Sequence, residues 1–165
     1  MKRYKSWPGL RKQLEERLCE PLKHRVTYFL TRYHEVHNSY GRASICLDGK
    51  ELVSFSWTEK YKQERDVYNY WQETGKWDFE DPELNRKWNQ EATFTDYDFL
   101  EAATDFLSLS IKDALKSENY LIRVFAIMDK RVGKRTLEEI LKSEEYKSYP
   151  DWVRQFYELR LKVDL

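Results

Sequence analysis

The dipeptide Asp48-Gly49 separates two stretches in which apolar and polar residues alternate, and this feature limits the possible folds more than any other in the chain. Asp-Gly in that setting is typical of a tight β-hairpin, because both residues tolerate the left-handed backbone that the turn needs. We predict antiparallel strands over 42–47 and 51–57. A three-residue loop, in preference to a two-residue turn, gives both strands one apolar face, made of Ala43, Ile45, Leu47, Val53, Phe55 and Trp57.

A third strand is predicted over 26–33, where β-branched and aromatic residues gather. The three strands would form an antiparallel meander whose apolar face needs a cover. An N-terminal helix from about Gly9 to Lys23 can supply part of that cover. Its leucines recur at every fourth position, as Leu10, Leu14, Leu18 and Leu22.

The rest of the chain has the periodicity and the capping signals of helices, and only five glycines and four prolines occur in 165 residues. We predict helices over about 58–74, 82–92, 95–116, 120–131 and 136–143, and a last helix from Pro150. Gly133 is expected to end one of them and Thr136 to cap the next. The expected fold is α+β, with an N-terminal helix and a three-stranded antiparallel meander packed on a C-terminal helical bundle. We expect one domain over 1–165, with a strand-bearing part at about 1–57 and a helical part at about 58–165.

Charge is balanced overall, with 29 basic and 29 acidic residues, so no net field draws the protein to nucleic acid or to anionic lipid. The charge is uneven along the chain, however. Residues 1–35 are mainly basic, residues 64–105 are mainly acidic, and residues 123–135 are basic again. We expect these segments to neutralise one another in the fold.

Aromatic residues make up 16% of the chain and are dense between Tyr61 and Phe99. Many of them must pack in the core, and core packing alone is one explanation of the whole set. The set is too dense for complete burial, so we expect part of it to form an exposed patch or to line a groove. The hypothesised partner-binding residues are Tyr70, Trp71, Trp77 and Phe79. Their neighbours are acidic, which favours a protein partner over the bases of a nucleic acid.

A basic cluster follows the apolar segment 121–128, in the sequence Asp129-Lys130-Arg131-Val132-Gly133-Lys134-Arg135-Thr136, here called the basic turn. A turn that leads into a helix offers free N–H groups and a positive dipole end, which suit phosphate or carboxylate. The hypothesised anion-binding residues are Arg123, Lys130, Arg131, Lys134 and Arg135. The stretch is not a P-loop, because its glycine spacing differs and a helix precedes it. Basic residues are common at helix ends, so a purely structural role is the alternative.

No catalytic residue, metal ligand or cofactor is predicted from local patterns. His34 and His37 lack the spacing of a helical or zinc-finger metal pair and suit a surface loop. Cys19 and Cys46 have no base nearby in sequence, which favours small buried side chains over a nucleophile. Helix capping and a solvated face account for the carboxylates of Asp78, Glu80, Asp81, Glu83, Asp96 and Asp98. An enzyme whose catalytic residues are scattered along the chain is left open.

The sequence also predicts the compartment. Two isolated cysteines indicate reduced thiols, the N-terminus lacks the apolar segment of a secretory signal, and no apolar run is long enough to span a membrane. We therefore expect a soluble, cytoplasmic protein.

Two stretches of the chain carry a resemblance to a known family. One runs from Leu10-Arg11-Lys12-Gln13-Leu14-Glu15 through Leu18-Cys19 to Arg25-Val26 and Thr31-Arg32-Tyr33, and the other from Ile122-Arg123 through the basic turn to Leu137. Together they resemble a small uncharacterised bacterial family of cytoplasmic proteins with no assigned function, over most of the chain. The resemblance implies a bacterial cytosolic source, and it implies no activity and no residue roles.

Three functional hypotheses follow. The favoured one is a non-enzymatic protein-interaction or regulatory module that uses the aromatic residues and needs a protein partner. The second is a phosphate-ligand or nucleic-acid binder that uses the basic turn at 130–135, with an affinity that falls as salt rises. The third is an enzyme with scattered polar residues. None of the three needs a membrane.

Overall fold

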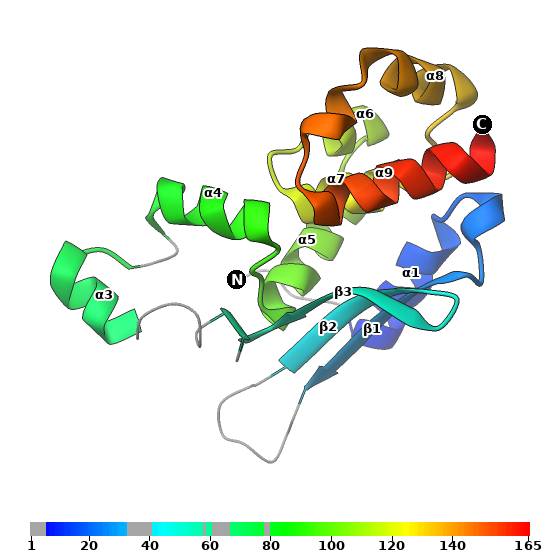
Figure 1. Cartoon of the computed structure of the whole chain (residues 1–165). Coiled ribbons are helices and arrows are strands. Elements are labelled where there is room, and N and C mark those ends of the chain that lie inside the picture. Colours follow the sequence, from blue (N-terminus) through cyan, green and yellow to red (C-terminus); the bar gives the residue numbers. More distant parts are fainter. Residues whose placement is uncertain (1–5, 33–40, 58, 61–66, 78–79) are drawn as a thin grey trace.

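The computed structural model describes residues 6–32, 41–57, 59–60, 67–77 and 80–165. Its sheet consists of β1 (Val26–Arg32), β2 (Gly41–Leu47) and β3 (Lys50–Ser56), which pair antiparallel in the order β1-β2-β3. Helices lie over one face of this meander, as Figure 1 shows. The predicted α+β fold, with its N-terminal helix, meander and helical C-terminal part, is confirmed.

The hairpin between β2 and β3 turns through Asp48 and Gly49, whose φ angles are 52° and 80°. Leu47 pairs with Lys50, so the loop has two residues and the prediction of three was wrong. A β-bulge between Ile45 and Cys46 shifts the register by one residue. The extra residue of the bulge does what a longer loop would have done. It brings Ile45 opposite Val53, so that the apolar residues of both strands lie on the core side of the sheet.

Helix α1 (Trp7–Glu16) is shorter than the helix predicted over 9–23. A 3₁₀ turn, Glu20–Leu22, follows it. Between the two, Leu18 forms an isolated β-bridge with Asp129, and the N–H of Cys19 donates to the carbonyl of Met128 over 2.9 Å. This pairing with a distant segment ends the helix early, while all four predicted leucines are still buried.

The middle of the chain contains α3 (Val67–Thr74), α4 (Pro82–Glu91) and α5 (Asp96–Ser108). The side chain of Asp81 caps α4, and Thr95 and Asp98 form a reciprocal capping box at the start of α5. The predicted start of a helix at Thr58 lies outside the described residues. Gly75 ends α3 as predicted, with a φ of 70°.

The C-terminal part contains α6 (Ile111–Leu115), α7 (Tyr120–Ile127), α8 (Lys134–Ser143), a 3₁₀ turn (Glu145–Ser148) and α9 (Asp151–Asp164). Three predicted boundaries were wrong. The helix expected over 95–116 is divided, because the hydroxyl of Ser110 caps a new helix. Helix α7 ends at Ile127 because Asp129, two residues later, pairs with Leu18 in the isolated β-bridge. Helix α8 begins at Lys134 with Gly133 as its N-cap, so Gly133 does not end α7 and Thr136 is not the cap.

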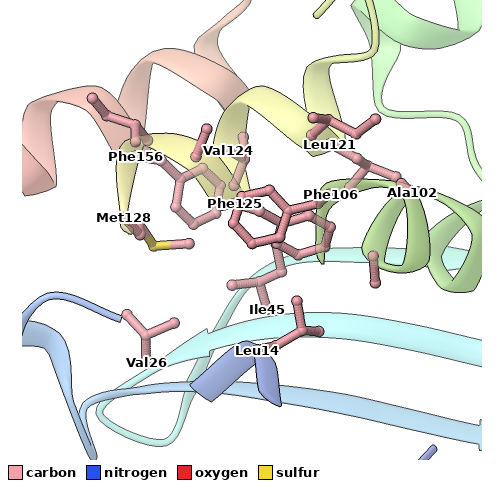
Figure 2. Packing of buried hydrophobic residues seen from close by; sticks show 14 of the residues in the cluster. Leu14, Val26, Ile45, Ala102, Phe106, Leu121, Val124, Phe125, Met128 and Phe156 are labelled. Atoms are coloured by element: carbon pink, nitrogen blue, oxygen red, sulfur yellow. The ribbon is translucent and has the colours of Figure 1, made fainter. Parts of the chain in front are cut away.

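The core lies between the sheet and helices α5, α7 and α9. Nearly all of α7 is buried, as predicted for the most apolar helix. Figure 2 shows Phe106 and Phe125 packed together above Ile45 and Leu14, and the two rings are 5.5 Å apart between centroids. Strand, N-terminal helix and C-terminal helices therefore share one hydrophobic cluster.

Candidate functional site

Two of the hypothesised partner-binding residues form a pair on the surface. Trp71 lies in α3 and is 43% exposed, and Trp77 follows the helix and is 46% exposed. Their ring centroids are 6.2 Å apart with an interplanar angle of 31°. The side chain of Tyr70 and all of Phe79 lie outside the described residues. We call Trp71 and Trp77 the tryptophan pair.

The tryptophan pair lies on a part of the molecule that projects from the rest. In Figure 1, α3 lies apart from the sheet and from α6 to α9. Every residue from Trp71 to Trp77 is exposed, and the exposed acids in and next to this stretch of sequence include Glu73, Glu80 and Glu83. The two rings contact each other, and much of both still faces solvent. Large aromatic side chains in this state are the usual anchors of protein interfaces.

The basic turn is partly engaged within the molecule. The N–H and guanidinium of Arg131 both donate to the carboxylate of Asp129, with a shortest guanidinium distance of 2.9 Å. The guanidinium of Arg135 donates to Glu139 over 3.3 Å on the surface of α8. Lys130 and Lys134 are exposed and have no ion pair with a described residue. The five hypothesised anion-binding residues are thus not assembled into one site.

Arg123 lies apart from the basic turn and has its own contacts. Its guanidinium donates to the hydroxyl of Tyr149 over 2.8 Å, and to the carbonyls of Ser117 and Lys116. It also lies 5.3 Å from the centroid of the Tyr149 ring. Burial raises the pKa of the Tyr149 hydroxyl, which keeps it neutral beside the guanidinium. Arg123 therefore ties the loop between α6 and α7 to the segment before α9.

A buried arginine that the sequence analysis missed explains why the basic turn has its shape. Arg160 of α9 is 3% exposed, and it donates to the carbonyls of Ile127, Asp129 and Val132 over 2.8 to 2.9 Å. It also pairs with Asp164 one turn later. These bonds satisfy carbonyl groups where α7 ends and the chain turns. The only sequence signal was an arginine on the apolar side of the last helix.

Lys60 is a second residue that sequence reasoning missed. Its ammonium lies 3.9 Å from the centroid of the Trp88 ring and 3.1 Å from a carboxylate oxygen of Asp98. Lys60, Trp88 and Asp98 all line a groove of about 760 Å³ between α4, α5 and the start of α7. The contact joins a cation, an aromatic face and a helix-capping carboxylate, so it fastens α4 against α5.

A second groove, of about 800 Å³, lies between α1 and β1. Trp7, Pro8 and Val26 provide apolar lining, and basic side chains surround them. We call it the α1–β1 groove. No local pattern in the sequence indicates this groove, because its lining comes from α1, from the start of β1 and from Lys130.

Neutralisation of the basic N-terminal segment by the acidic central segment stays a prediction. Basic residues of 6–32 pair with Glu15, Glu20, Asp48 and Asp129, none of which lies in the central acidic segment.

The remaining candidates are the histidines, the cysteines and the carboxylates named from the sequence. His34, His37 and Asp78 lie outside the described residues. Within the described ranges, no three His, Cys, Asp or Glu side chains are grouped so that they could hold a metal ion. Burial raises the pKa of the Cys19 thiol, which disfavours the reactive thiolate. Asp81 and Asp98 cap helices as predicted, whereas Asp96 is fully buried and does not belong to a solvated face.

Comparisons with known proteins add a family to this description. No helix in the described part of the chain is long and apolar enough to cross a bilayer. Searches of curated proteins and of solved structures found no match. A comparison with protein families matches residues 6–161, which include both stretches of the resemblance seen in the sequence up to Leu137. On that match, the chain belongs to the SF0329 protein family.

Proposed function

We propose that this chain is a non-enzymatic protein-interaction or regulatory module of the bacterial cytosol, and that it contacts its partner through the tryptophan pair. One observation carries the proposal: Trp71 and Trp77 remain 43% and 46% exposed while they contact each other. A partner that covered both rings would gain a large apolar contact at a small cost in conformational entropy, because each ring already restrains the other.

The surroundings of the pair define the chemistry of the partner. Glu73, Glu80 and Glu83 are exposed and lie close to the pair in the sequence. A complementary surface offers an apolar pocket for the rings and basic side chains at its rim. The acidic charges steer the encounter, and the buried rings supply most of the affinity.

The alternative proposal is a phosphate or nucleic-acid ligand at the basic turn. It is supported by the exposed Lys130 and Lys134 beside the start of α8. With Arg131 held by Asp129 and Arg123 held at Tyr149, fewer cations face such a ligand than the sequence suggested.

Co-purification from the native cell, at low and at high salt, separates the two proposals. A stoichiometric protein that survives high salt and is lost from the Trp71→Ala/Trp77→Ala variant supports the tryptophan pair. Leu141→Ala is the matched control, since Leu141 is 45% exposed on α8. Nucleic acid or a phosphorylated compound that co-purifies at low salt and dissociates at high salt would contradict the tryptophan-pair proposal and support a ligand at the basic turn.

A further inference from the structure

Strand β1 is an edge of the described sheet, and its free side opens into the α1–β1 groove. The order of the sheet is β1-β2-β3, and Val26 and Thr27 line the groove. An edge strand beside a helix is the geometry in which an extended peptide can add a further strand to a sheet.

The register identifies which backbone groups of β1 are available. The N–H of Asp48 donates to the carbonyl of Arg25 over 2.8 Å, so the Arg25 carbonyl points toward β2. Bonded and non-bonded pairs alternate along an antiparallel ladder. Thr27, Phe29 and Thr31 therefore bond to β2, whereas Val26, Tyr28 and Leu30 point their N–H and C=O groups away from it. These outward groups have no hydrogen bond with any described residue.

The side chains around the groove define what kind of strand fits. Arg11, Lys12, Lys23 and Lys130 line it, against Glu15 and Glu16. Arg11 is paired with Glu15, and Lys23 with Glu20. Lys12 and Lys130 are exposed, and neither has an ion pair with a described residue. The apolar surfaces of Trp7 and Pro8 lie on the side of α1.

We propose that the α1–β1 groove binds an extended, acidic peptide segment of a partner protein, which adds a strand to the free edge of β1. Backbone groups of Val26, Tyr28 and Leu30 bind the peptide backbone. Lys12 and Lys130 bind its acidic side chains, and its apolar side chains contact Trp7 and Pro8. This site goes beyond the proposed function, because it uses a surface separate from the tryptophan pair.

The first test selects ligands from a displayed library of random peptides of about ten residues, on the full chain. The proposal predicts enriched peptides in which acidic and apolar residues alternate. Binding of a synthesised peptide should weaken about tenfold or more in Lys12→Glu/Lys130→Glu. Lys112→Glu/Lys142→Glu is the control, because it reverses two exposed lysines that do not line the groove. Thermal melting checks that both variants fold.

The second test locates the peptide by amide hydrogen exchange. On binding, exchange at Val26, Tyr28 and Leu30 should slow, while Thr27 and Phe29, already bonded to β2, should change little. This alternation is specific to strand addition, since a peptide held by charge alone would protect none of the three.

The proposal is overturned if no acidic peptide is enriched, if the charge reversal leaves binding unchanged, or if the bound peptide protects other amides. The Trp71→Ala/Trp77→Ala variant is measured in parallel. It should bind the peptide like the wild type, so failure of the groove and failure of the tryptophan pair are distinguished. If that variant loses the peptide, the two surfaces are one site and the inference as stated is wrong.

Discussion

The guanidinium of Arg131 folds back onto the carboxylate of Asp129, and the backbone N–H of Arg131 donates to the same group over 2.7 Å. The Asp129 side chain is fully buried, and the guanidinium of Arg17 also approaches it, to 4.0 Å. The most basic stretch of the sequence is thus organised around a buried acid. A cluster that resembled a ligand site in sequence acts, in this part of the fold, to hold the end of α7 against the end of α1.

Asp129→Asn should therefore destabilise the protein. It leaves Arg17 and Arg131 without their anionic partner, and we expect the free energy of unfolding to fall by about 2 kcal/mol. Urea denaturation measures this. The control is Asp151→Asn, where the acid is 90% exposed and pairs with Arg154, with an expected loss of about 0.5 kcal/mol or less. Equal losses in both variants would contradict the structural role of Asp129.

Replacement of Arg160 should have a larger effect. Arg160→Met keeps much of the apolar stem but leaves the carbonyls of Ile127, Asp129 and Val132 without a donor. We expect a loss of about 3 kcal/mol or more in the free energy of unfolding. Arg154→Met, on the exposed side of the same helix, should lose far less. A melting curve of Arg160→Met close to that of the wild type would show that these bonds contribute little.

Alanine should have opposite effects on the free energy of unfolding at Gly41, which lies next to a buried acid, and at Gly9. A Cβ atom on Gly41 would lie 2.1 Å from a carboxylate oxygen of Asp96, which is fully buried. Gly41→Ala should therefore cost about 1–3 kcal/mol, as overpacking does in a well-packed core. Gly9→Ala, in α1 with Ser6 Oγ at 3.5 Å as its nearest contact, should be neutral or stabilising by up to about 1 kcal/mol. Denaturation of both variants side by side checks the contrast.

Local signals in the sequence were sufficient for most elements. Asp48-Gly49 located the hairpin, Thr95 and Asn119 located two helix starts, and the apolar run of α7 identified the most buried helix. Two of the wrong boundaries, the ends of α1 and α7, share one cause, which is contact between segments far apart in sequence. Leu18 pairs with Asp129, and that pairing shortens both α1 and α7.

The sites were harder to predict for the same reason. Exposure of Trp71 and Trp77 agrees with the expectation that the aromatic set could not all be buried. The roles of Arg160 and Lys60 depend mainly on partners 28 to 38 residues away, which no local pattern indicates. The α1–β1 groove likewise exists only once α1 lies beside the sheet edge.

Alkaline pH should destabilise the fold. Burial raises the pKa of the hydroxyls of Tyr28 and Tyr157 far above the ordinary range. In the unfolded chain these groups ionise near pH 10, so above that pH the unfolded state binds fewer protons than the folded state. The free energy of unfolding should be insensitive to these groups below about pH 9 and fall as pH rises further.

Urea denaturation across this range, with tyrosinate absorbance as a second readout, measures the effect. Tyr28→Phe/Tyr157→Phe removes both hydroxyls and should flatten the alkaline decline. If the free energy of unfolding of the double variant declines with the same slope, the alkaline destabilisation comes from titratable groups other than Tyr28 and Tyr157.

The binding constant of the purified partner for tryptophan-pair variants tests the central claim most directly. Trp71→Ala and Trp77→Ala should each weaken binding by about 2 kcal/mol, or roughly thirtyfold, as truncation of a buried aromatic anchor does. Leu141→Ala should leave the constant unchanged, and circular dichroism should show that all three variants are folded. An unchanged binding constant in folded Trp71→Ala and Trp77→Ala would contradict the account and show that the partner contacts another surface.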